Sequence, residues 1–178
     1  MKYKEALTSA MEWLGSKDDT LFLGQACRVS GHSISSTLVN VPMEKRIELP
    51  VFEETQLGIS TGMSLMGFTT ITVYPRFDFL ILAMNQLVNH LDKIEEMSRG
   101  DMKPRVIIRV SVGSKNPIDA GPQHTQDHTE AIKKMLTNVN VVTLNEPEDV
   151  FPAFKKAYER KDSKSTLIVE YGEFYGSK

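Results

Sequence analysis

The stretch Glu53-Glu-Thr-Gln-Leu-Gly-Ile-Ser-Thr-Gly-Met-Ser-Leu-Met-Gly67 decides the fold of this 178-residue chain. It predicts a helix over 53–66, and an apolar segment that reads as a strand follows it. Gly58 and Gly62 lie four residues apart, on one face of that helix. Glycine costs about 1 kcal/mol relative to alanine inside a helix. The pair therefore indicates a face where another backbone approaches closely.

Two carboxylates open the same helix. Glu53 and Glu54 fall at its N-terminus, where the helix dipole stabilises a negative charge. A carboxylate held there against a tightly packed surface is typical of a binding site. An acidic pair at the start of an ordinary packed helix fits the same pattern.

The rest of the chain alternates short apolar strands with helices. We expect helices over 3–15, 53–66, 77–97, 127–137 and 147–160, and strands over 20–23, 69–73, 105–110, 140–144 and 166–170. This order indicates one α/β domain over residues 1–178, with a doubly wound, mostly parallel sheet covered by helices on both faces. Residues 25–46 and 111–123 are expected to be long irregular connections.

Ligands of such sheets bind outside the carboxyl ends of the strands. Gln25, Tyr74 and the loop 111–124 each follow an expected strand, so they fall at that edge. The loop ends in the second informative stretch, which runs from Gly121 to His128.

Composition narrows the class of protein. The net charge of −2 gives no electrostatic reason to expect a nucleic acid, and the paired lysines at 133–134 and 155–156 fit solvated helix faces. Cys27 is the single cysteine, which excludes an internal disulfide and favours a reducing compartment. Residues 1–14 do not resemble a secretory signal, and no run of about 18 apolar residues occurs. We expect a soluble, cytoplasmic domain.

His124 is the candidate for proton transfer. A histidine at the ligand edge can donate, accept or shuttle a proton near neutral pH, although His124 also fits a helix cap or an exposed side chain. Its spacing of four to His128 resembles a metal-binding pair, but no third ligand is evident, and we predict no metal site on this chain. His32 and His90 fit structural or surface positions.

The segment Tyr74-Pro-Arg-Phe-Asp-Phe79 places aromatic rings at a strand end and a helix start. Such rings can stack on a flat heterocycle, and they fit the ordinary core equally well. Arg76 can face an anionic ligand or pair with a glutamate. No glycine-rich phosphate loop, Gly-x-Ser-x-Gly elbow or partnered cysteine nucleophile occurs.

Taken in order, these features are similar to those of a known family. The chain resembles the pyrimidine-binding domain of transketolase-like thiamine diphosphate enzymes, and especially the beta subunit of the pyruvate dehydrogenase type of decarboxylating component. The resemblance runs nearly end to end. Its signals are Tyr3-Lys-Glu-Ala, Leu21-Phe-Leu-Gly, Glu53 with its glycines, Phe77-Asp-Phe, Asn85-Gln-Leu-Val-Asn, Gln123-His-Thr-Gln and Glu170-Tyr-Gly-Glu-Phe-Tyr-Gly.

The resemblance implies roles for four residues. A glutamate at the position of Glu53 hydrogen-bonds a ring nitrogen of the cofactor's aminopyrimidine, which favours the tautomer that generates the thiazolium carbanion. Phe77 matches the aromatic residue that stacks on the pyrimidine ring. His124 matches the histidine that faces the substrate carbonyl, and Gln25 is expected beside the cofactor. Glu53 and His124 are thus the expected catalytic residues.

The resemblance also implies a partner. The family holds the diphosphate and its magnesium ion with a Gly-Asp-Gly motif and a later Asn, and this chain contains no Gly-Asp-Gly. It also stops near the start of a further C-terminal domain of the usual beta subunit. We therefore expect a second subunit to hold the diphosphate, with homodimer contacts within a heterotetramer.

The implied activity is decarboxylation of a 2-oxo acid, or transfer of the resulting acyl unit. A split transketolase subunit and a non-catalytic regulatory or scaffold partner of a thiamine diphosphate enzyme are the alternatives. The loop 111–120 is longer than the family pattern, so the resemblance does not specify the substrate.

Overall fold

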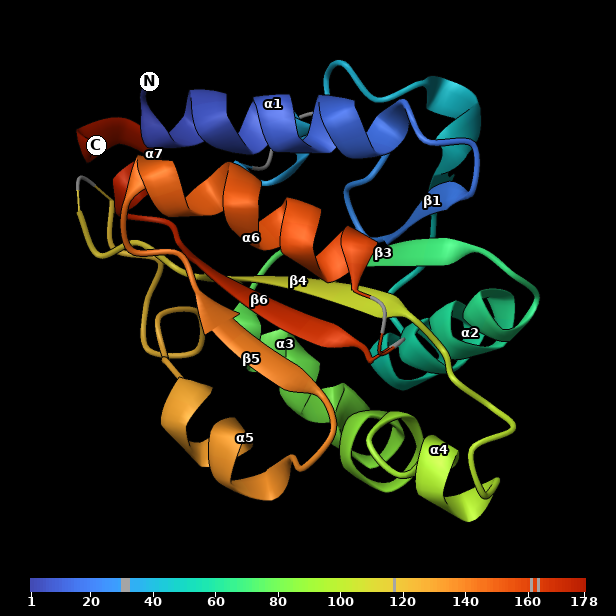
Figure 1. Cartoon of the computed structure of the whole chain (residues 1–178). Coiled ribbons are helices and arrows are strands. Elements are labelled where there is room, and N and C mark those ends of the chain that lie inside the picture. Colours follow the sequence, from blue (N-terminus) through green and yellow to red (C-terminus); the bar gives the residue numbers. More distant parts are fainter. Residues whose placement is uncertain (30–32, 117, 161, 163) are drawn as a thin grey trace.

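The computed structural model describes residues 1–29, 33–116, 118–160, 162 and 164–178. Its centre is a six-stranded sheet in the order β2-β1-β3-β4-β6-β5, and every neighbouring pair of strands is parallel (Figure 1). The strands are β1 (Thr20–Gly24), β2 (Arg46–Glu48), β3 (Thr69–Tyr74), β4 (Val106–Val112), β5 (Asn140–Thr143) and β6 (Thr166–Tyr171).

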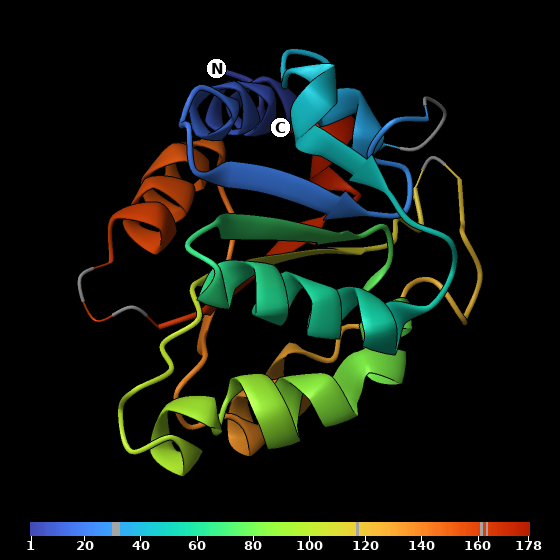
Figure 2. The same cartoon turned by 90° about the vertical axis from the view of Figure 1, so that its right-hand side faces the viewer.

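Helices cover both faces of this sheet. One face carries α1 (Tyr3–Gly15), α6 (Pro147–Glu159) and α7 (Phe174–Ser177), and the other carries α2 (Glu53–Leu65), α3 (Phe77–Leu80), α4 (Ile94–Met97) and α5 (Thr129–Met135) (Figures 1 and 2). Short turns of 3-10 helix, η1 (Ser35–Thr37) and η2 (Met43–Lys45), lie between β1 and β2. The expected doubly wound α/β fold is confirmed.

Two hydrophobic layers hold the fold together, one on each face of the sheet. Leu7 and Leu14 of α1 pack with Phe154 of α6 on the first face, and Leu57 of α2 packs with Phe77 of α3 on the second. All of these side chains have no exposed surface. Since strands β3 and β4 lie between the two layers, every one of their residues is buried, as is usual for the central strands of a parallel sheet.

The expected helix over 77–97 is wrong in its continuity. The segment divides into α3, a 3-10 turn η3 (Ile81–Ala83), a π-helical stretch η4 (Asn85–Leu91) and α4. Asp92 supplies a physical reason, because its buried carboxylate accepts hydrogen bonds from the backbone N–H groups of Thr137, Asn138 and Val139. This anchor fixes the end of the π-helical stretch to the loop before β5.

The connection over 25–46 also contains more order than expected. Its last residue, Arg46, begins the edge strand β2, whose Ile47 pairs with Leu23 of β1. The C-terminal helix α7 was not expected either. His32, to which we assigned a structural or surface position, lies outside the described residues.

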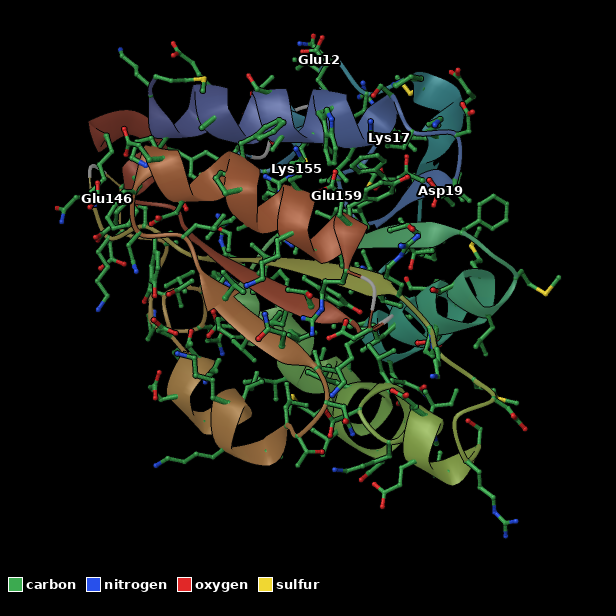
Figure 3. All side chains as sticks on the ribbon, in the orientation of Figure 1. Glu12, Lys17, Asp19, Glu146, Lys155 and Glu159 are labelled. Carbon is green, nitrogen blue, oxygen red and sulfur yellow. The ribbon has the colours of Figure 1, made fainter. Side chains whose placement is uncertain are left out.

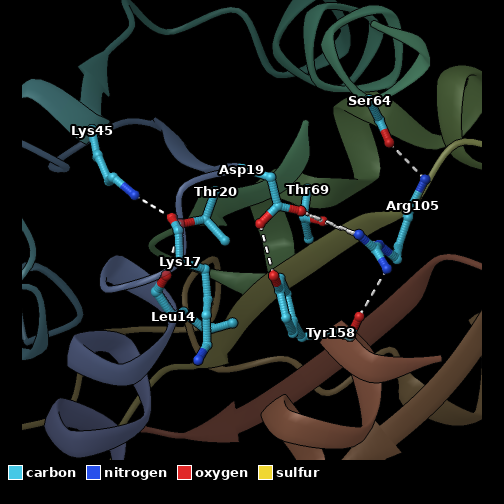
Figure 4. Close-up of polar contacts among 9 residues, drawn as sticks. All are labelled: Leu14, Lys17, Asp19, Thr20, Lys45, Ser64, Thr69, Arg105 and Tyr158. Atoms are coloured by element: carbon cyan, nitrogen blue, oxygen red, sulfur yellow. Dashed lines mark hydrogen bonds and ion pairs between the residues drawn. The ribbon is translucent and has the colours of Figure 1, made fainter. Parts of the chain in front are cut away.

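A polar cluster braces the edge of the sheet where the strands begin (Figure 4). Asp19 accepts a hydrogen bond of 2.7 Å from the Tyr158 hydroxyl and an ion pair of 3.3 Å from Arg105. Arg105 also donates to the hydroxyl of Thr69, and its backbone N–H donates to Ser64 over 2.6 Å. These contacts tie β1, β3 and β4 to α2 and α6 at one edge, opposite the edge where the strands end.

The surface fits the expectation from composition. Lys155 and Glu159 project outward from α6 as an i, i+4 pair with 4.0 Å between Nζ and Oε1 (Figure 3). Lys133 is exposed and pairs with Glu130. Cys27 is a free thiol inside the core. In the part of the chain that the structure describes, no helix has both the length and the apolar character needed to cross a membrane.

Candidate functional site

Glu53 is a buried carboxylate at the first residue of α2. Its exposed fraction is 4%, which is unusual for a glutamate. The Oε1 atom accepts a hydrogen bond of 3.0 Å from Nε2 of Gln25, which directly follows β1. Within the described part of the chain, its second carboxylate oxygen has no hydrogen-bond donor. The position therefore combines a helix N-terminus, burial and one unused acceptor.

Tyr74 holds the start of α2 against the end of β3. Its hydroxyl donates to the backbone carbonyl of Glu53 over 3.1 Å. Burial is the main cause that raises the pKa of Tyr74 well above its usual value, so the hydroxyl stays protonated and remains a donor. Two strand ends thus fix the glutamate: β1 through Gln25, and β3 through Tyr74.

The close approach that we expected on α2 occurs next to Gln56. The amide of Gln56 donates to Thr72 and to the carbonyl of Val73, at 2.9 and 3.0 Å. Gly24 makes room for it: a Cβ at Gly24 would lie 2.7 Å from Nε2 of Gln56 and 2.3 Å from the Val73 carbonyl oxygen. By contrast, a Cβ at Gly62 would meet nothing within 4 Å. The outer face of α2 around Gly62 is therefore open in the isolated chain.

His124 approaches the same edge from the loop after β4. Its ring stands edge-on to Phe79, with 5.5 Å between centroids and an interplanar angle of 83°. The Nδ1 atom is buried and has no partner among the described residues. Gly113 allows this position, because a Cβ there would lie 1.8 Å from the His124 carbonyl oxygen. A buried ring nitrogen without a partner is available to a ligand.

One cavity of about 410 Å³ joins these elements. Gln25, Arg76, Phe79 and His124 line it, with the carboxylate of Glu48 and several apolar side chains. Both oxygens of Glu48 are engaged, because each accepts a backbone N–H hydrogen bond of 2.7 Å from the loop after β1. The structure thus brings Gln25 and His124 to one cavity, and Glu53 adjoins it through its hydrogen bond to Gln25.

Phe77 does not line this cavity. Its side chain has no exposed surface, and its ring packs edge-on against His128 with 5.6 Å between centroids. Phe79, two residues further on, is the aromatic residue of that segment that faces the cavity. The role of Phe77 in stacking on a cofactor stays a prediction.

His124 and His128 have different surroundings. His128 lies 3.7 Å from Oδ1 of Asp78, which also accepts a hydrogen bond of 2.7 Å from Gln126. His124 instead contacts Phe79. Within the described ranges, no group of three or more His, Cys, Asp or Glu residues is arranged to hold a metal ion.

A buried ion pair supports the neighbouring strand ends. Arg109 of β4 binds Glu170 of β6 through both carboxylate oxygens, and the Tyr175 hydroxyl donates to the same carboxylate. Arg109 and Glu170 have no exposed surface. Burial opposes the charge on Arg109, but Glu170 outweighs it and raises the pKa of the guanidinium. Burial, followed by the charge of Glu48, raises the pKa of Cys27 to about 12, so this thiol is not a nucleophile at neutral pH.

Sequence reasoning missed Phe79 and Glu48 as cavity residues. Phe79 carried a signal, because it belongs to the aromatic segment that follows β3. Glu48 carried none, since the short edge strand β2 was not expected.

The fold and this edge define a class: a parallel α/β domain that presents a buried glutamate and a histidine where the strands end. Residues 1–174 match the family described as "Transketolase, pyrimidine binding domain", and the chain belongs to that family.

Individual relatives agree with this assignment. The chain is 31% identical over 180 residues to the mitochondrial pyruvate dehydrogenase E1 component subunit beta of Saccharomyces cerevisiae, covering 99% of this chain and 48% of the relative. It is 24% identical over 182 residues to the 2-oxoisovalerate dehydrogenase subunit beta of Bacillus subtilis, covering 98% of this chain and 53% of the relative. The chain therefore spans about half the length of these relatives.

A solved structure shows the same fold. The chain described as "Split gene transketolase, inactive beta4 tetramer" superposes with a TM-score of 0.72 at 18% identity, over 96% of this chain and 51% of that one.

Proposed function

We propose that this chain supplies the pyrimidine half of the cofactor site in a thiamine diphosphate-dependent enzyme that decarboxylates a 2-oxo acid. The observation that carries the proposal is the buried Glu53 carboxylate at the start of α2, with one oxygen held by Gln25 and the other unused. The family membership and the names of the relatives, which are dehydrogenase beta subunits, support it.

The residues at the site fit an aminopyrimidine. A carboxyl group beside a ring nitrogen can share a proton with it, and Glu53 is kept from bulk water by burial. When bound, thiamine diphosphate supplies the carbanion that attacks a carbonyl carbon. In our proposal, Glu53 hydrogen-bonds the ring nitrogen, and Gln25 orients the carboxylate. His124, with its unpartnered Nδ1, holds or moves a proton at the substrate carbonyl.

The aromatic contact has two candidates. Phe77 is the residue that the family resemblance selects, and Phe79 is the residue on the cavity wall. We propose that Phe77 supports the floor of the site from within the core, unless its ring moves when the cofactor binds.

The diphosphate and magnesium require a second subunit in this proposal. The described residues present no cluster of acidic and histidine side chains for a cation, and hard cations need several oxygen ligands. The relatives are themselves named as subunits, which supports a heteromer with homodimer contacts through this domain. We retain the proposal of a cytoplasmic location, although the yeast relative is named as mitochondrial.

Co-purification and reconstitution test the proposal. The tagged chain is recovered from its native host, and the chains bound to it are identified by mass spectrometry. We expect a partner that carries Gly-Asp-Gly and a later Asn, and thiamine diphosphate- and magnesium-dependent release of carbon dioxide from a 2-oxo acid by the pair. Recovery of an active thiamine enzyme whose turnover does not depend on Glu53 would instead support a scaffold role.

A further inference from the structure

Arg76 lies between two cavities. It directly precedes α3, its side chain is half-buried, and it lines the 410 Å³ cavity that contains His124. It also lines a second cavity of about 790 Å³, with Lys4, Ser114 and Asn116 among the polar side chains around it. One guanidinium group therefore faces both spaces.

This guanidinium lacks a counter-ion. Its Nη1 donates to the carbonyl of Pro75 over 2.8 Å, and among the described residues it takes part in no ion pair. Arginine has five N–H donors, so most of them are left for a ligand. A half-buried charge without a partner is costly, and an anion that binds there removes part of that cost.

Gly113 places Arg76 beside His124. A Cβ at Gly113 would lie 1.8 Å from the His124 carbonyl oxygen and 3.4 Å from Cδ of Arg76. The loop that carries His124 and the side chain of Arg76 therefore pack against the same glycine. A ligand group bound by Arg76 lies close to whatever His124 contacts.

The other charged group on the smaller cavity does not compensate Arg76. Glu48 uses both carboxylate oxygens to accept backbone N–H groups of Ala26 and Arg28. Arg76 is the permanent cation among the described residues that line this cavity. The cavity is thus prepared for an anion next to the histidine.

We propose that Arg76 is a specificity-determining residue that binds the carboxylate of a 2-oxo acid substrate. The inference rests on the proposed function, in which His124 faces the substrate carbonyl. In a 2-oxo acid the carboxylate is bonded directly to that carbonyl carbon, whereas the phosphate of a ketose phosphate is several carbons away. Because Arg76 and His124 share Gly113, their placement fits the 2-oxo acid. A planar guanidinium binds a carboxylate through two parallel hydrogen bonds.

A binding measurement on the full chain tests Arg76 without any turnover. The side-chain Nε–H resonance of Arg76 is followed by NMR during titration with pyruvate, methyl pyruvate and inorganic phosphate. We expect a saturable shift with pyruvate that Arg76→Gln abolishes and that the control Arg99→Gln, on an exposed arginine before β4, leaves unchanged. No saturable shift with pyruvate, or an equal shift with methyl pyruvate or phosphate, would overturn the carboxylate assignment.

Kinetics of the reconstituted complex give a second readout. With pyruvate, we expect Arg76→Gln to raise KM at least about tenfold, because a charged hydrogen bond is lost, with little change in kcat. Acetaldehyde carries the same two-carbon unit without the acid group, so its KM should not change. Arg76→Lys should recover part of the loss for pyruvate. An equal change for both donors would overturn the proposal.

The two proposals fail separately. A wild-type complex that is inactive with every thiamine-dependent donor contradicts the proposed function, and the NMR titration still decides whether Arg76 binds a carboxylate. An active complex in which Arg76→Gln leaves the KM for pyruvate unchanged contradicts this inference alone.

Discussion

Nε2 of Gln25 donates to Oε1 of Glu53 over 3.0 Å, which joins the end of β1 to the start of α2. The two residues are 28 positions apart in the chain, and the parallel sheet brings them together. The hydrogen bond fixes the orientation of a carboxylate that has almost no contact with water. Most of what we propose for this site depends on that orientation.

Removal of this hydrogen bond should affect the cofactor more than the fold. Gln25→Met keeps the length of the side chain and loses the donor, so we expect a loss of about 1 kcal/mol in the free energy of unfolding. In the reconstituted complex, the KM for thiamine diphosphate should rise. Chemical denaturation and cofactor titration measure the two effects. Gln126→Met, on an exposed glutamine, is the control, and an equal effect of both variants would contradict the role of Gln25.

Gly113 should not tolerate a side chain. In Gly113→Ala, the new Cβ overlaps the His124 carbonyl oxygen, so the loop must move and we expect a loss of about 1–3 kcal/mol in stability. Turnover should fall because His124 is displaced. Gly176→Ala has no neighbour within 4 Å and should change neither quantity. A fully active and stable Gly113→Ala would show that the loop does not pack as described.

The outer face of α2 separates folding from assembly. A Cβ at Gly62 meets nothing within 4 Å, so Gly62→Ala should stabilise the isolated chain by up to about 1 kcal/mol. If this face contacts another subunit, Gly62→Leu should leave the isolated chain folded and prevent assembly, which thermal denaturation and light scattering can measure. An intact complex with Gly62→Leu would rule out close packing at this helix.

Asp92 should make stability depend on acid pH. Burial disfavours its charge, but the backbone N–H donors and Lys93 outweigh burial and lower its pKa from 3.8 to about 2. Because the folded-state pKa is depressed, the stabilisation is present above pH 3.8 and is lost as the pH falls toward 2. We expect Asp92→Asn to cost about 1–3 kcal/mol at neutral pH. The difference from wild type should shrink through that acid window in urea denaturation, and a difference independent of pH would contradict this assignment.

Much of the fold follows from local patterns in the sequence. Ala6, Leu7, Ala10, Met11 and Leu14 repeat at helical spacing, and all are buried on α1. The strands that flank Glu53 were recognisable as short apolar runs. The break in the helix after Phe77 was not recognisable, because it depends on Asp92 meeting the loop before β5, a contact between residues about 45 positions apart.

The site was predictable in part, for the same reason. Glu53 at the start of α2 follows from sequence, because a helix N-terminus favours a carboxylate. The cavity does not follow, because β2 brings Glu48 beside β1 through tertiary pairing. The sequence also does not distinguish Phe77 from Phe79, since the choice of the exposed ring depends on how the short α3 helix sits on the sheet.

The most direct test of the account is turnover of the reconstituted complex with Glu53→Gln, compared with Glu54→Gln. Glu54 is the next residue on α2, and its carboxylate is exposed and accepts a hydrogen bond from Asn85. We predict that Glu53→Gln assembles normally and loses at least about 100-fold in kcat, because it cannot share a proton with the cofactor ring. Glu54→Gln should keep near wild-type activity. Equal activity of the Glu53→Gln complex and wild type would contradict the assignment of Glu53 as the residue that activates the cofactor.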